Sequence, residues 1–400
     1  MAKQSAAIDI SYSKALKVVI LFGIISLFAD MTYEGARSIT GPYLAFLGAN
    51  AVTVGFVSGF GELIGYGLRL LSGYLADRTG RYWSITIIGY LLNLLAVPLL
   101  AIAGYWWLAA MLMILERMGK AIRTPPRDAM LSHAGHTVGM GWGFGLHEAL
   151  DQLGAMLGPL MVAAVLYFKG SYQESFAVLL IPALIALILL TGARFLYPHP
   201  QSLEAQQDHL EMKETQNKAF WFYLAGASCI AAGYADFPLI AYHFEKLSIL
   251  PQLWIPIAYA IAMGVDGLGA LIFGRLYDKN GFIVLIIVTL ISCFFAPFVF
   301  LGGAISAVFG VILWSIGVGA HESLMRAVIA NMVPTNKRAS AYGLFNMGYG
   351  VFWFLGSVLM GLLYDYSVTA VVIFSLVIQL AAIPILWIVM RQMKQKHKTE

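Results

Sequence analysis

The sequence has 400 residues, of which 60% are hydrophobic and only 12% charged, and its mean hydropathy is +0.78. Soluble domains carry about 25% charged residues, so this composition excludes an ordinary soluble protein and indicates one built for a membrane. The formal net charge is only +4, and we find no basic patch of the kind that binds nucleic acid.

Apolar runs long enough to cross a membrane recur from residue 15 almost to the C-terminus. A hydrocarbon core of ~30 Å needs about 20 helical residues, because every backbone amide must be satisfied within the segment. We therefore predict an all-α membrane protein with twelve spans, at residues 15–46, 51–76, 82–104, 106–132, 141–168, 173–197, 219–244, 251–278, 281–301, 305–333, 338–365 and 368–391.

The distribution of lysine and arginine between loops predicts the orientation of these spans. Alternate loops are basic, as at Arg78 and Arg81, whereas the loops between them offer little beyond Lys169 and Lys246. By the positive-inside rule both termini are expected in the cytoplasm, and the expected location is the cell (inner) membrane. Both cysteines fall inside predicted helices, so no disulfide framework is expected.

The chain repeats itself at a spacing near 200 residues, on either side of one long hydrophilic stretch. "GYLADRTGRY" at 73 recurs as "GRLYDKNGF" at 274, and "FAD" at 28 recurs as "YAD" at 234. We predict a six-helix bundle over residues 1–198, a cytoplasmic linker over 199–218 and a second six-helix bundle over 219–400. Transporters with such repeats place the substrate site between the halves, near the bilayer midplane.

The segment "GYLADRTGR" resembles the loop signature of the major facilitator superfamily. The resemblance implies two pseudo-symmetric bundles of six helices and a cytoplasmic latch at Asp77 and Arg81, with glycine at 80 for a turn of positive φ. A merely solvated charged turn is the alternative. The gate and latch residues expected on this basis are Gly73, Asp77, Arg78, Gly80 and Arg81, with Asp278 in the repeat.

Two further signatures are matched in part. "GAMLGP", which contains Gly154, Gly158 and Pro159, is similar to an element of helix 5 in proton-coupled antiporters, although the paired glycines that usually follow are missing. Small residues at this spacing also let helices pack closely in lipid. Arg117 matches the arginine that the family carries in helix 4, but the glycine expected four residues later is Ala121.

Acidic residues at membrane depth are the first chemical signal, because an ionisable group in a spanning helix is costly unless it is paired or hydrated. Asp30, Glu34 and Arg37 are spaced by four and three residues and share one helical face. We predict Asp30 and Glu34 as the proton-coupling pair, with Glu62 next. The alternative is a structural ion pair at the outer end of the first helix.

A basic stripe in the fourth predicted helix is the second signal. Lys120, Arg123 and Arg127 are separated by three and four residues, and Pro125 and Pro126 should free the carbonyl groups of residues 121 and 122. Arg123 and Arg127 could instead lie near the cytoplasm and follow the positive-inside rule. The predicted substrate-binding residues are Arg117, Lys120, Arg123, His147, Asp151, His321 and Glu322.

The function predicted from these features is secondary active transport by alternating access. We expect a proton-coupled antiporter that exports a small organic solute, anionic or amphipathic, through the lipid bilayer. An exchanger or importer of organic phosphates or anions is one alternative, and an uncoupled lipid scramblase or transporter-like receptor is another. No enzyme activity, cofactor, metal or nucleic-acid partner is expected, and the protein is expected to be a monomer.

Overall fold

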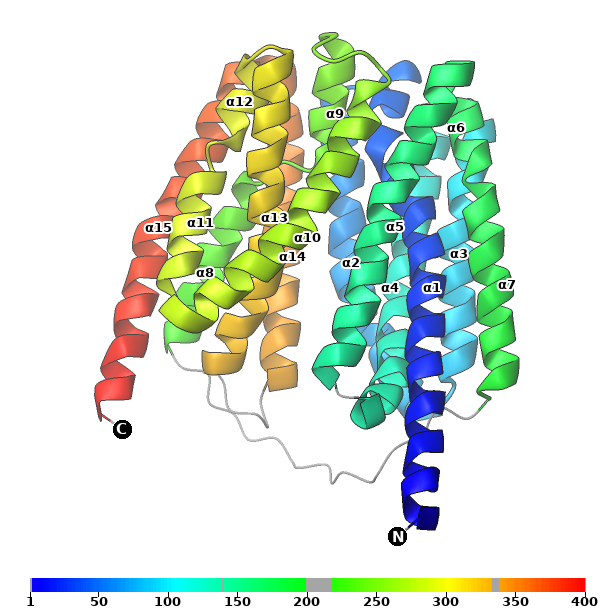
Figure 1. Ribbon diagram of the computed structural model, residues 1–400. Helices are drawn as coiled ribbons and strands as arrows, with labels where there is room; N and C mark the ends of the chain where they lie inside the picture. Colours follow the sequence, from blue (N-terminus) through cyan, green and yellow to red (C-terminus); the bar gives the residue numbers. More distant parts are fainter. Residues whose placement is uncertain (1, 139, 199–217, 333–337, 400) are drawn as a thin grey trace. The chain divides into compact units, whose positions relative to one another are not determined.

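A computed structural model describes residues 2–138, 140–198, 218–332 and 338–399, and every regular element in these ranges is a helix (Figure 1). The predicted all-α class is confirmed. Nearly all of the predicted linker, residues 199–217, lies outside the described residues.

The chain divides into two compact units, which are described separately. The first comprises Met1–Arg37 and Gly67–Asp208, and the second comprises Ser38–Tyr66 and His209–Glu400. The first two helices therefore contribute to both units. The helices of the N-terminal half are α1 (Ala2–Phe46), α2 (Ala51–Thr79), α3 (Tyr82–Leu99) with the 3₁₀ turn η1 (Leu100–Ile102), α4 (Trp106–Val138), α5 (Met140–Lys169), α6 (Tyr172–Val178) and α7 (Leu180–Leu196).

The helices of the C-terminal half all belong to the second unit. They are α8 (Lys218–Gly233), α9 (Phe237–Lys246), α10 (Trp254–Asn280), α11 (Ile283–Ser292), α12 (Phe295–Leu301), α13 (Ala304–Met332), α14 (Arg338–Tyr366) and α15 (Val368–Thr399).

The span predicted as one helix at 219–244 is broken between α8 and α9. The break leaves the carbonyl group of Gly233 outside the helical ladder, and two side chains of α15 satisfy it: Ser375 Oγ donates at 2.7 Å and Gln379 Nε2 at 3.0 Å. α9 restarts with Pro238 in its first turn, where a missing amide hydrogen costs nothing. Apolar periodicity could not reveal this break, because the residues on both sides are equally buried.

Among the residues that the structure describes, eleven segments are long and apolar enough to cross a membrane, from Tyr12–Phe46 to Val368–Met393. The remaining predicted span is α4, which is helical throughout but carries the charged residues Glu116, Arg117, Lys120, Arg123, Arg127 and Asp128. The protein is therefore a multi-pass membrane protein by fold and composition, and the total of twelve spans stays a prediction.

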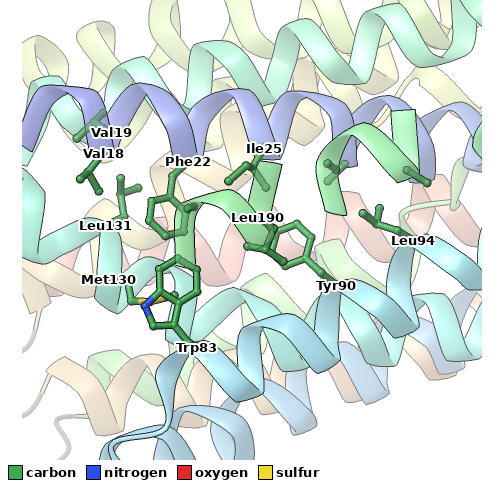
Figure 2. Packing of buried hydrophobic residues seen from close by; sticks show 14 of the residues in the cluster. Val18, Val19, Phe22, Ile25, Trp83, Tyr90, Leu94, Met130, Leu131 and Leu190 are labelled. Carbon is green, nitrogen blue, oxygen red and sulfur yellow. The ribbon is translucent and has the colours of Figure 1, made fainter. Parts of the chain in front are cut away.

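The core of the first unit packs α1 against α3, α4 and α7 (Figure 2). Phe22 of α1 stacks on Trp83 of α3 with ring centroids 5.8 Å apart, and Met130 and Leu190 are fully buried beside them. Because lipid tails are as apolar as these side chains, van der Waals packing rather than removal from water stabilises the contacts between spanning helices. This packing holds the polar face of α1 in register with α4.

Close helix contacts explain several of the glycines that the sequence signatures contain. A Cβ atom at Gly154 would collide with the carbonyl oxygen of Leu27, and one at Gly158 would collide with that of Met31. The segment "GAMLGP" therefore packs α5 directly on α1. Gly80 and its repeat counterpart Gly281 have φ of +64° and +71°, so the predicted turn is confirmed and recurs in the second half.

Candidate functional site

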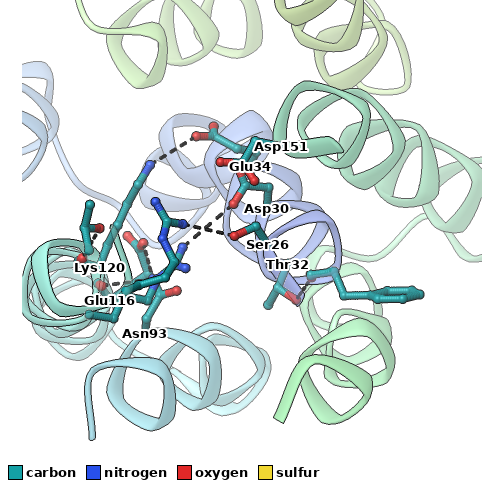
Figure 3. A network of polar contacts seen from close by, with 12 residues as sticks. Ser26, Asp30, Thr32, Glu34, Asn93, Glu116, Lys120 and Asp151 are labelled. Carbon is teal, nitrogen blue, oxygen red and sulfur yellow. Dashed lines mark hydrogen bonds and ion pairs between the residues drawn. The ribbon is translucent and has the colours of Figure 1, made fainter. Parts of the chain in front are cut away.

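The acidic face of α1 lies against the basic stripe of α4 in the first unit (Figure 3). Lys120 Nζ is 3.7 Å from Glu34 Oε1, and Arg123 Nη2 is 3.8 Å from Asp30 Oδ1. Because the helices run in opposite directions, residues spaced by four on α1 meet residues spaced by three or four on α4. The two groups that the sequence predicted separately thus form one network of paired charges.

Arg123 is the most deeply buried charge of this network, with 1% of its surface exposed. Its guanidinium carbon lies 4.3 Å from the centroid of the Tyr90 ring, a geometry typical of a cation–π contact. Within the described part of the chain, Arg123 Nε and Nη1 and Asp30 Oδ1 find no hydrogen-bond partner. The contact between Arg123 and Asp30 is therefore electrostatic, and these two donors and this acceptor keep their hydrogen-bonding capacity unused.

Lys120 forms the more accessible edge of the network. Its side chain is 22% exposed, compared with 8% for that of Glu34. The ammonium group also lies 4.0 Å from the centroid of the Tyr33 ring. Lys120 is therefore the more accessible of the two paired cations.

A relay of hydrogen-bonding groups extends the network from α4 through α1 to α5. Arg127 Nη1 donates to Ser26 Oγ at 3.0 Å, and the same hydroxyl lies 2.9 Å from His147 Nε2. His147 Nδ1 lies 3.4 Å from Asp151 Oδ2, and the Asp151 side chain is 16% exposed. The relay joins buried charges to a carboxylate at the edge of the cluster.

The segment of α4 that precedes Lys120 makes a second polar contact, with α3. Asn93 Nδ2 donates to the backbone carbonyl of Glu116 at 3.1 Å and to its side-chain Oε1 at 2.8 Å. Arg117 Nε lies 3.5 Å from Glu116 Oε2. Arg117, predicted to bind substrate, is thus held beside its neighbour in sequence, one turn from Lys120.

The two prolines of α4 do not interrupt the helix, which runs from Trp106 to Val138. Pro125 removes the amide that would bond to the carbonyl of Ala121, and Ser72 Oγ of α2 donates to that oxygen at 3.2 Å. The predicted free carbonyl is therefore confirmed at residue 121, and a neighbouring helix satisfies it.

Other predicted residues lie away from this network. Glu62 belongs to the second unit, as does His321, whose Nε2 lies 3.1 Å from Thr289 Oγ1. The side chain of Glu322 lies outside the described residues. Of the substrate-binding and coupling residues that were predicted, the structure brings together Asp30, Glu34, Lys120, Arg123, His147 and Asp151.

The loop signature is ordered locally around Asp77. Tyr82 Oη donates to Asp77 Oδ1 at 2.9 Å, and Arg78 Nη1 donates to Tyr74 Oη at 3.3 Å. A Cβ atom at Gly73 would lie 3.4 Å from Cβ of Pro125, an ordinary contact. Asp77, Arg81 and Asp278 are exposed, and their role in a latch stays a prediction.

Sequence reasoning missed the uncharged members of the network, Ser26, Tyr33, Tyr90 and Asn93. Ser26 lies four residues before Asp30, so extending the acidic face by one helical turn would have found it. Tyr33, Tyr90 and Asn93 give no such signal, because a buried aromatic or amide in a spanning helix is more often packing than part of a site.

Comparison with known proteins agrees with this architecture. The chain matches the Major Facilitator Superfamily over residues 22–325 and 308–400. It is 42% identical over 375 residues to an uncharacterized protein of Mycobacterium tuberculosis, with 92% of each chain covered. It is 28% identical to an uncharacterized MFS-type transporter of Methanocaldococcus jannaschii, with 88% of this chain and 89% of that one covered.

Two further likenesses are more distant. The multidrug resistance protein MdtH of Proteus mirabilis is 33% identical over 30% of each chain. The crystal structure of the nucleoside transporter NupG superposes with a TM-score of 0.72 at 14% identity, covering 94% of this chain and 98% of that one, which shows a shared fold. The helical fold and the composition define a multi-pass membrane protein. The chain belongs to the Major Facilitator Superfamily, a family of membrane transporters.

Proposed function

We propose that this protein is a proton-coupled secondary transporter whose solute carries an acidic group. The observation that supports this function is the pairing of Asp30 with Arg123 and of Glu34 with Lys120 inside the first unit. The two carboxylates neutralise the two cations, so an anion can bind there only if a carboxylate moves away or takes up a proton.

The proposal fixes the sign of the coupling. A proton on Asp30 or Glu34 removes the negative charge that competes with an incoming anion for Arg123 or Lys120. The anion in turn draws the cation away from the carboxylate, which then binds a proton more readily. Because such linkage is reciprocal, proton and anion bind better together than either does alone. The two therefore cross the membrane in the same direction.

This direction differs from the antiport that the sequence signatures favour. Antiport requires that proton and solute compete, and a solute with a positive charge would compete with protons for Asp30 and Glu34. The likeness to a multidrug resistance protein over 30% of the chain supports export of such a solute as the second candidate function. The charge of the solute therefore decides between cotransport and antiport.

The pH dependence of binding tests the proposal on purified protein. Benzoate, glycerol 3-phosphate, tetraphenylphosphonium and benzyl alcohol represent a carboxylate, a phosphate, a cation and a neutral solute, and thermal stabilisation reports which of them binds. We expect an anion to bind about 5- to 150-fold more tightly at acidic than at alkaline pH, the usual range of coupling between two ligands.

Neutral replacements of the coupling carboxylates provide the internal check. Asp30→Asn and Glu34→Gln mimic the protonated state, so each should bind the anion at alkaline pH more tightly than the wild type and lose most of the pH dependence. Glu174→Gln, at an exposed carboxylate of α6, serves as the matched control. Anion binding that tightens as the pH rises would exclude the proposed coupling. A cation that binds more tightly as the pH rises would support antiport.

A further inference from the structure

The N-terminus of α2 is completed by a residue from α14. The first amides of a helix have no partner within it, and in α2 they divide between two side chains. Asn50 Oδ1 accepts from the Thr53 amide at 3.0 Å, as an ordinary N-cap residue does. The two preceding amides bond to Asp365, which lies 314 residues after Ala51 and 313 after Val52. Ala51 N donates to Asp365 Oδ1 and Val52 N donates to Asp365 Oδ2, each at 3.4 Å.

Each carboxylate oxygen of Asp365 thus accepts a hydrogen bond from one amide of α2. The carboxylate also faces the positive end of the helix dipole, where a negative charge is favourable. Asp365 is the second-last residue of α14, so a charge at the end of one helix caps the beginning of another. Both partners lie within the second unit.

Glycines bring the two helices close enough for this cap to form. A Cβ atom at Gly361 would lie 2.6 Å from the carbonyl oxygen of Ala51, and one at Gly55 would collide with that of Ser357. A third contact ties α1 to α9, where a Cβ atom at Gly41 would collide with the Pro238 oxygen. The segment 38–66 therefore sits on α9 and α14 through backbone contacts that any side chain would obstruct.

We propose that Asp365 is a latch that holds the segment 38–66 against α9 and α14 in one state of the transport cycle. The contact is made of a charge and two amides that water can satisfy once the helices separate, and beneath it the glycine contacts alternate with edge-to-face aromatic pairs such as Phe56–Phe354 and Tyr66–Tyr349. Such a contact can form and break repeatedly. The inference rests on membership of a transporter family and does not depend on proton coupling or on the charge of the solute.

The latch is tested by a cysteine that reacts only when α2 leaves α14. Ser357 of α14 is buried and its Cβ lies against Gly59 of α2, so Ser357→Cys, in a protein with Cys229→Ala and Cys293→Ala, reports separation by its rate of labelling with an impermeant maleimide. Asp365→Asn should raise this rate about two- to fivefold, the range expected for one carboxylate at a helix terminus.

Salt distinguishes a latch from a structural role, because an exposed charge at a helix terminus is screened by ions. Labelling of the otherwise wild-type reporter should rise with salt, whereas the Asp365→Asn reporter should respond little. Gly361→Ala should open the same contact by steric conflict and raise labelling as well, and Glu174→Gln should leave it unchanged. If Gly361→Ala raises labelling and Asp365→Asn does not, the contact opens but Asp365 does not hold it, and the proposal is overturned.

Discussion

Equivalent positions of the two sequence repeats carry different chemistry. In the first repeat, Asp30 lies 3.8 Å from Arg123, an ion pair with little contact to water. In the second, the residue at the position of Asp30 is Asp236, whose Oδ2 accepts hydrogen bonds from the neutral donors Trp353 Nε1 at 2.9 Å and Ser357 Oγ at 3.2 Å. At the repeat spacing near 200 residues, the residue that corresponds to Arg123 is His321, 198 positions later, and it contacts the hydroxyl of Thr289.

The two repeats are therefore expected to differ in their sensitivity to protonation. A buried pair of opposite charges is sensitive to protonation, because neutralising one partner leaves the other without compensation. A histidine beside a hydroxyl, as His321 is beside Thr289, places no comparable demand on its surroundings. In the function proposed above, it is therefore the first repeat that couples solute binding to protons.

The largest expected effect comes from removing the cation of the first repeat. Arg123→Ala leaves Asp30 buried without its partner, and breaking such a pair typically costs about 3–5 kcal/mol. We expect this loss in the free energy of unfolding, measured in detergent micelles with chemical denaturant. The double variant Asp30→Asn/Arg123→Ala should recover part of the loss, because no uncompensated charge remains. Equal stability of the single variant and the wild type would show that the pair is not a coupled unit.

A much smaller effect is expected at the equivalent acid of the second repeat. Asp236→Asn keeps an oxygen that can accept from Trp353 and Ser357, so we expect it to cost less than Arg123→Ala in the same unfolding measurement. The variant should also retain the pH dependence of solute binding that Asp30→Asn loses. Loss of that pH dependence in Asp236→Asn would contradict the division of roles between the repeats.

The sequence predicted the fold and the charged part of the site because both depend on simple periodicities. Apolar length located the spans, and spacings of three and four placed Asp30 with Glu34 and Lys120 with Arg123 on single helical faces. What the sequence could not supply was the pairing across helices, since helical periodicity says which face a residue occupies and nothing about the helix opposite.

The unpredicted features share a physical cause: each depends on contacts between residues distant in the chain. The break between α8 and α9 is stabilised from α15, by Ser375 and Gln379. The cap on α2 comes from Asp365, which looks in the sequence like an ordinary charge at the end of a span. The roles of Tyr33 and Tyr90 follow only from the cations that lie over their rings.

The central claim, that the charge pairs of the first repeat couple an acidic solute to protons, is tested most directly by counting protons during binding. The anion that stabilises the protein best is titrated into purified protein in weakly buffered solution, with a pH indicator, at a pH above that of tightest binding. The account predicts net proton uptake by the wild type, and less uptake by Asp30→Asn and Glu34→Gln. Proton release, or no change in proton content while the anion binds, would contradict it.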